Sequence, residues 1–172
     1  MPLIVEDGSI VANANSYAAL SEADNYFQAR NNQIWMSLEE DVKNALLIQA
    51  TDYIDLRFGR RFLGAKKTDT QPLQFPRVNV EWTTPIPEVL KRACFEYAIR
   101  AKDGPLAPDP KFDESGTVTI VRREKVGPLE TEHRTPTAGI GSQVMKFRPY
   151  PGADELLTPL LVVNRYNAWT RN

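Results

Sequence analysis

The side chains that most often carry out chemistry are few in this sequence, and their spacing matches no catalytic motif. The only histidine, His133, lies in a segment expected to be an exposed strand, and the only cysteine, Cys94, lies on the apolar stripe of a predicted helix. One histidine and one cysteine are too few for a zinc site. Neither glycine-rich phosphate loop, G-x-G-x-x-G or G-x-x-x-x-G-K-[ST], occurs. We therefore expect no enzymatic activity, no bound metal and no cofactor.

Two carboxylates three residues apart, Asp52 and Asp55, could form an acid–base pair because this spacing places them on one face of a helix. Solvated carboxylate pairs at the same spacing are common. The alternative, which we favour, is a polar flank that pairs with nearby arginines.

A basic cluster follows these carboxylates and is the best candidate for contact with nucleic acid. Its members are Arg57, Arg60, Arg61, Lys66 and Lys67. Phe58 and Phe62 interleave with the cluster, as a base-stacking surface requires, but both also fit the core end of a helix. The formal net charge of −1 and the pI near 5.9 argue against a protein whose main task is to coat nucleic acid, so any such contact is local.

Helical segments must position these residues. Residues at spacings of three and four predict a main helix from the Ser-x-x-Glu capping box at Ser37 to Phe58. The face expected to be buried consists of Leu38, Val42, Ala45, Leu46, Gln49 and Tyr53, with Ala50, Ile54 and Phe58 beside them. A first helix starts at Ser21 as N-cap, and a third follows Pro87. Short β-prone pieces around Asp7-Gly8 predict an N-terminal hairpin.

The fold class that follows is mainly α, with a three-to-four-helix bundle core, an inserted β-hairpin and an extended C-terminal arm. We expect one domain over residues 1–172, with the helical core at 12–104, the hairpin at 116–134, and a flexible arm and docking segment at 135–172. A single cysteine suits a reducing compartment. The sequence contains no apolar run of about 20 residues, the length that a membrane span needs.

Several stretches, taken in order, resemble one family. They are Asn15-Ser16-Tyr17, Glu22-Ala23-Asp24-Asn25-Tyr26-Phe27, Ala50-Thr51-Asp52-Tyr53-Ile54-Asp55, Gln71-Pro72-Leu73-Gln74-Phe75-Pro76-Arg77, Ile86-Pro87 before a helix with Ala93, and Val126-Gly127 inside a hairpin. Together they resemble the head–tail connector (adaptor) proteins of tailed bacteriophages. Some sequences of this kind are described as DnaT-like single-stranded DNA-binding proteins. The resemblance covers most of the chain and rests on order and spacing, because no single motif is diagnostic.

The resemblance implies a structural virion protein in the neck, at the head–tail interface, with the host cytoplasm as its location during assembly. Such adaptors form a ring, typically of twelve subunits, below the portal. DNA passes through the ring, and the tail or a stopper assembles on it. The implied partners are the portal protein, a stopper or tail-completion protein, further copies of the chain and DNA only as the passing genome, with no membrane. A single-stranded DNA-binding or replication-associated module is the alternative.

Two sets of contact residues follow as hypotheses. A C-terminal segment that docks on the portal would use apolar side chains, namely Leu156, Leu157, Leu160, Leu161, Tyr166 and Trp169. The alternative is that Leu156, Leu157 and Leu160 close the core of the subunit itself. A contact with a neighbouring subunit or the stopper would use the charged residues of the hairpin, namely Arg122, Arg123, Lys125, Glu130 and Glu132, although these charges could equally stabilise the hairpin.

Overall fold

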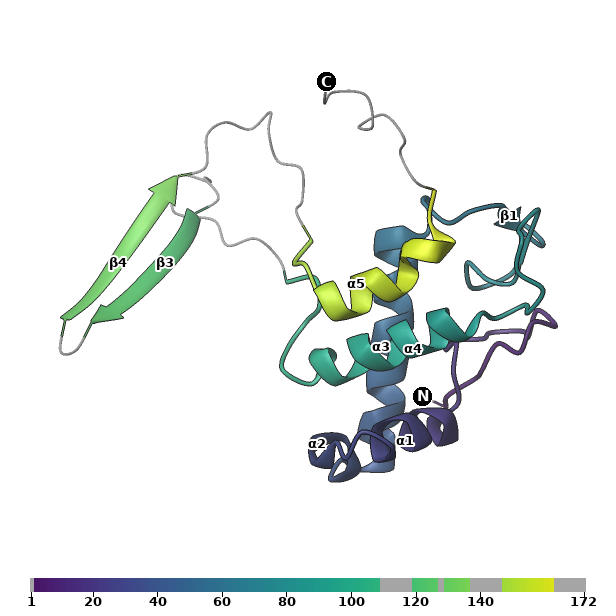
Figure 1. The fold of residues 1–172 in the computed structure, drawn as a ribbon, viewed down its shortest axis with the longest axis horizontal. Coiled ribbons are helices and arrows are strands. Elements are labelled where there is room, and N and C mark those ends of the chain that lie inside the picture. The colour runs from purple at the N-terminus through teal and green to yellow at the C-terminus, as the bar shows by residue number, and fades with distance from the viewer. Residues whose placement is uncertain (1, 109–118, 127–128, 137–146, 163–172) are drawn as a thin grey trace, which may run out of the picture. The chain divides into compact units, whose positions relative to one another are not determined.

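The computed structural model describes residues 2–108, 119–126, 129–136 and 147–162. The chain divides into two compact units, one formed by Met1–Leu106 with Arg148–Asn172 and the other by Ala107–Phe147. The first unit is helical and the second contains a β-hairpin, so the prediction of a mainly α protein with a small hairpin is confirmed (Figure 1).

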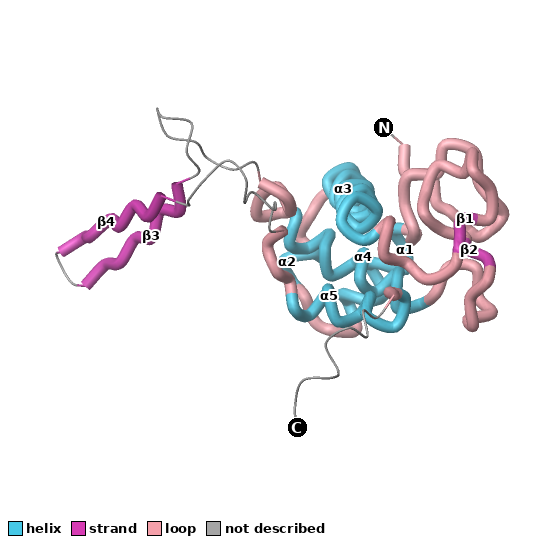
Figure 2. Tube along the Cα trace, turned by 90° about the horizontal axis from the view of Figure 1, so that it is seen from above, coloured by secondary structure: helices cyan, strands magenta, loops and turns pink. Residues whose placement is uncertain are grey.

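Five helices of the described chain build the helical unit. They are α1 (Leu20–Gln28), α2 (Gln33–Met36), α3 (Glu40–Phe58), α4 (Glu88–Ala101) and α5 (Pro151–Leu157), and a 3-10 turn, η1 (Thr158–Leu160), follows α5. The long helix α3 packs against α4, and α4 packs against α5 (Figures 1 and 2). The buried face of α3 includes Leu47, Ala50 and Ile54, each fully buried at the predicted spacing of three and four. The main predicted helix is therefore present, but its predicted stripe is wrong in part, because Val42, Ala45 and Gln49 are exposed. The face that packs on the core is the one that carries Leu47, Ala50 and Ile54.

The first and the main helix each start two residues from the predicted position. Ser37 is the C-cap of α2 rather than the N-cap of the main helix, which has Glu39 in that position. The first helix has Ala19 as N-cap instead of Ser21, and the Ala19 N–H donates to Glu22 Oε2 at 2.9 Å. Ser37 ends α2 as its C-cap, so it does not cap the main helix, and this explains the first shift.

The predicted N-terminal hairpin around Asp7-Gly8 is wrong. Instead, the chain wraps around the carboxylate of Glu6, which is 1% exposed and accepts backbone N–H bonds from Gly8 at 2.7 Å, Ile10 at 3.0 Å and Val11 at 3.0 Å. A buried carboxylate is stable only with such donors. Gly8 has a φ of +101°, and a Cβ there would lie 2.3 Å from Pro85, so both conformation and space require glycine.

The segment between α3 and α4 forms a second layer on the helices. A two-residue strand β1 (Ala65–Lys66) pairs antiparallel with β2 (Arg77–Val78), and the proline-bounded stretch between them buries Phe75 completely. The Phe75 ring meets Tyr17 and Phe62 edge-on, with centroids 5.8 and 4.9 Å apart. This layer therefore attaches to the core through an aromatic residue.

The second unit contains β3 (Thr119–Val126) and β4 (Leu129–Pro136), paired antiparallel. The predicted hairpin is present, with its return strand ending two residues beyond the expected 134. The predicted turn at residues 127–128, and residues 137–146 and 163–172 of the predicted arm and docking segment, lie outside the described residues.

Candidate functional site

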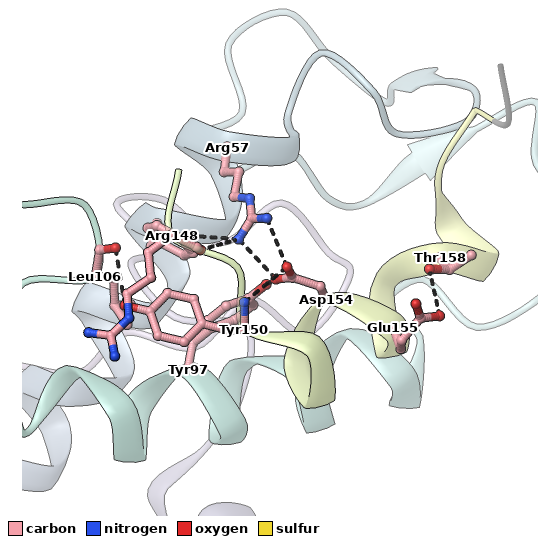
Figure 3. A network of polar contacts seen from close by, with 9 residues as sticks. Arg57, Tyr97, Leu106, Arg148, Tyr150, Asp154, Glu155 and Thr158 are labelled. Atoms are coloured by element: carbon pink, nitrogen blue, oxygen red, sulfur yellow. Dashed lines mark hydrogen bonds and ion pairs between the residues drawn. The ribbon is translucent and has the colours of Figure 1, made fainter. Parts of the chain in front are cut away.

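The most concentrated group of polar contacts in the helical unit gathers around one carboxylate on α5, Asp154 (Figure 3). It accepts two parallel hydrogen bonds from Arg57 of α3, at 2.9 Å to Oδ1 and 2.8 Å to Oδ2. It also accepts the hydroxyl of Tyr97 on α4 and the backbone N–H of Tyr150, the latter at 3.1 Å. The bidentate geometry is the strong form of an arginine–carboxylate pair.

Tyrosine rings surround this ion pair. The rings of Tyr53 and Tyr97 lie with centroids 5.0 Å apart, and Tyr150 meets both of them edge-on at 6.0 and 5.8 Å. The pKa of Tyr97 is raised, mainly by burial and also by the neighbouring Asp154 carboxylate. The tyrosine therefore stays protonated and donates to the carboxylate over the physiological range.

We name these five residues the α5 anchor: Tyr53, Arg57, Tyr97, Tyr150 and Asp154. It fixes α5 to both α3 and α4. Sequence reasoning missed it because Arg57 and Asp154 are separated by 97 positions, and no local pattern links them.

The anchor also fixes the place where the chain leaves and re-enters the helical unit. The unit's first part ends at Leu106 and its second begins at Arg148. The hydroxyl of Tyr150 donates to the carbonyl oxygen of Leu106 at 3.3 Å. The two ends of the inserted segment therefore start from one site in the helical unit.

The anchor changes the interpretation of the basic cluster. Arg57 is engaged by Asp154, and Lys66 donates from Nζ to the carbonyl oxygen of Gln71 at 2.9 Å. Arg60, Arg61 and Lys67 are exposed.

The two interleaved aromatics are covered by the core. Phe58 is 2% exposed and Phe62 is 3% exposed, so neither presents a ring face to a base. The alternative in which they close the end of the helix is the one observed, and only the charges of the cluster remain at the surface.

The predicted docking leucines are mostly internal. Leu157 is fully buried, and Leu160 and Leu161 are 2% and 7% exposed; Leu156 is partly exposed. The chain after η1 continues beside the end of α3, where the Val162 N–H donates to the carbonyl oxygen of Arg61 at 2.8 Å. The buried leucines thus close the subunit's own core, as the alternative stated. Tyr166 and Trp169 lie outside the described residues.

The backbone register of the hairpin pairs residues of opposite charge. Arg123 lies opposite Glu132, and Lys125 lies opposite Glu130, while Arg122 lies opposite His133. Opposite charges in such cross-strand positions stabilise a hairpin by a few tenths to about 1 kcal/mol. Whether these residues also contact a neighbour remains a hypothesis.

The two carboxylates singled out in the sequence have different environments. Asp52 is exposed, whereas Asp55 is largely buried and accepts the hydroxyl of Tyr17 and the backbone N–H of Gln74, the latter at 3.0 Å. Burial raises the pKa of Asp55 to about 6, against the smaller lowering by these two hydrogen bonds. Asp55 therefore ties α3 to the N-terminal segment and to the layer above it, and the predicted pairing with arginines is wrong for this residue.

Cys94 behaves as the sequence predicts. It is fully buried, and its thiol lies 3.5 Å from the hydroxyl of Thr51. Burial raises the pKa of the Cys94 thiol to about 12, so it is an inert core residue rather than a nucleophile.

Two further features are absent from the described part of the chain. No group of three or more histidine, cysteine, aspartate or glutamate side chains there is placed to hold a metal ion. No helix in the same part combines the length and the hydropathy that crossing a bilayer would take.

Comparison with known proteins gives one match. The model of the family described as "Putative DnaT-like ssDNA binding protein" matches residues 1–171. A search of curated proteins found no match, and neither did a search of solved structures. Because the family model matches almost the entire sequence, the chain belongs to the family described as putative DnaT-like ssDNA-binding proteins.

Proposed function

We propose that the protein is a structural component of a tailed-bacteriophage virion, a head-to-tail adaptor that forms a ring below the portal and receives the tail or a stopper. It is not an enzyme and holds no cofactor in this role. The family resemblance seen in the sequence motivates the proposal. Its physical support is the insertion of a hairpin unit into a helical unit whose exit and entry points, Leu106 and Tyr150, are hydrogen-bonded to each other.

This arrangement suits an assembly part because the two units are separable in function. The helical unit closes its own core with α5, so it does not need the hairpin to complete its packing. In this proposal the hairpin contacts a neighbouring subunit or a stopper protein. Rings use heterologous contacts, in which one surface meets a different surface of the next copy.

The first test is the mass of the purified protein alone and after mixing with its portal protein. The adaptor role predicts a complex with portal, and self-association into a ring of about twelve copies on it. Changing Arg122 and Arg123 together to glutamate should leave the helical unit folded and weaken ring or stopper contacts. A protein that gives no complex with portal under any assembly condition would contradict the proposal.

Portal docking by the C-terminal segment has a separate test. Because Leu157, Leu160 and Leu161 belong to the core, the informative deletion is residues 163–172, which removes Tyr166 and Trp169 and retains the leucines. Loss of portal binding with an unchanged melting temperature supports docking by that segment. Unchanged portal binding would exclude it.

Single-stranded DNA binding is the second candidate, and the family description favours it. On the described surface its best support is the exposed charge of Arg60, Arg61 and Lys67. Phosphate contacts of this kind make the affinity depend on salt.

Fluorescence anisotropy of a labelled oligonucleotide at two salt concentrations tests this role. This candidate predicts an affinity for the oligonucleotide that falls as the salt concentration rises. It also predicts weaker binding in Arg60→Glu and Arg61→Glu, and unchanged binding in the control Lys102→Glu. No binding at low salt would exclude it.

A further inference from the structure

The outer face of α3 carries a continuous stripe of exposed residues at alternating spacings of three and four. Its members are Val42, Ala45, Gln49, Asp52 and Leu56, all exposed. Figure 2 shows α3 at one side of the helical unit, with α4 and α5 on the same side of it. Spacing of this kind is the pattern by which one helix seats against another.

The two ends of the stripe are apolar to an unusual degree for exposed positions. Val42 is 44% exposed and Leu56 is 69% exposed. They are fourteen residues apart on α3, which is about four turns and about 21 Å, so they lie close to one line along the helix. Gln49 lies midway between them, at the centre of the stripe.

Charge is distributed along the same helix with opposite signs at its two ends. Exposed carboxylates precede and begin α3, at Glu39, Glu40 and Asp41. Exposed guanidinium groups follow its last turn, at Arg60 and Arg61. A second copy of α3 laid antiparallel would bring each acidic end beside a basic end, whereas a parallel copy would bring like charges together.

We propose that the outer stripe of α3 is a self-association surface, on which a second copy of this chain seats its own α3 antiparallel about a two-fold axis at Gln49. Val42 of one copy meets Leu56 of the other, and the reverse contact occurs at the opposite end, as an isologous interface requires. The central pair of glutamines sets the register, as a single polar residue does in coiled coils. Asp52 lies beside the small Ala45 of the other copy and stays in contact with water.

This proposal does not depend on the adaptor or DNA-binding role. One stripe of one helix buries little surface compared with a stable dimer interface. The association is therefore weak, and sedimentation equilibrium of the full chain should cover about 1 µM to about 1 mM. We expect a monomer–dimer equilibrium. Leu56→Glu and Val42→Glu should each raise the dimer dissociation constant at least about tenfold. The control Val78→Glu, at another exposed valine, should leave it unchanged. A protein that remains monomeric at the highest concentration would overturn the proposal.

Cross-linking tests the two-fold geometry. In a Gln49→Cys variant the new thiols face each other across the axis, and the native Cys94 does not compete because it is fully buried. We expect a disulfide-linked dimer under mild oxidation, and little from the control Glu88→Cys at the exposed start of α4. If the Gln49→Cys variant dimerises in sedimentation but forms no disulfide under mild oxidation, the copies associate through another surface. That result would overturn the proposal.

A charge exchange tests the orientation. Changing Glu40 and Asp41 to lysine should weaken the dimer, and adding Arg60→Glu and Arg61→Glu in the same chain should restore it. Failure of the second pair to restore association would exclude the antiparallel arrangement.

Discussion

The buried carboxyl of Asp55 should make the protein less stable as the pH rises from mildly acidic to neutral. In the folded chain burial raises its pKa from 3.8 to about 6. Between these two values the folded state holds a proton that the unfolded chain has released. The unfolding free energy therefore falls as the pH rises, because the folded state binds more protons. The contribution is fully present below 3.8 and is lost as the pH passes through about 6.

The size of the effect follows from the pKa difference. The rise from 3.8 to about 6, at about 1.4 kcal/mol per pH unit, corresponds to about 3 kcal/mol. This is an upper value, because the part of the side chain that remains exposed is screened by water. Against a total stability of about 5 to 15 kcal/mol for a domain, a change of this size is readily measured.

Urea unfolding at a series of pH values between about 4 and about 7 isolates this group when wild type is compared with Asp55→Asn. The unfolding free energy of wild type should fall relative to that of Asp55→Asn by up to about 3 kcal/mol across the series. The control Asp69→Asn, at an exposed loop position, should run parallel to wild type. Parallel curves for wild type and Asp55→Asn would refute the reasoning.

Three further perturbations test the interior. Asp154→Ala removes the carboxylate that pairs with the mostly buried Arg57. It should lower the unfolding free energy by about 3 kcal/mol in urea unfolding. A decrease below about 1 kcal/mol, the range of surface ion pairs, would contradict the α5 anchor. Glu6→Ala leaves three backbone N–H groups without their acceptor and should cost at least about 2 kcal/mol by the same measurement, whereas the exposed Asp7→Ala should cost much less. Cys94 should react with a thiol reagent only at the rate of unfolding, and rapid labelling of the folded protein would contradict its burial.

The sequence determined the helical elements well where a pattern of three and four residues ran long enough. The stripe from Leu46 to Phe58 required a helix with one apolar face, and that face is buried. The run of β-branched residues around Ile120 likewise predicted a strand, and its pairing with the segment around Arg134 is the one observed. These features depend only on neighbours along the chain, so local periodicity is sufficient to find them.

The contacts that define the site are not local. Arg57 and Asp154 meet because α5 returns to the helical unit after the inserted hairpin. Glu6 collects three N–H donors because the N-terminal segment bends around it rather than forming the hairpin that Asp7-Gly8 indicated. The Arg57–Asp154 pair forms only when segments far apart in the chain come together, so no sequence pattern indicates it. The donors to Glu6 are two to five residues away, and there the sequence pattern indicated the wrong local turn.

The composition gave a net charge close to zero. The periodic segments indicated a mainly helical chain with one β-hairpin in its last third. Only the tertiary structure decided which leucines of the C-terminal segment are core and which side of α3 is left uncovered. An apolar residue in a sequence must be buried somewhere, but whether it is buried against its own chain or another one depends on which elements pack together. That choice is made by contacts between segments far apart in the chain, such as those of Arg57 with Asp154 and of Tyr150 with Leu106.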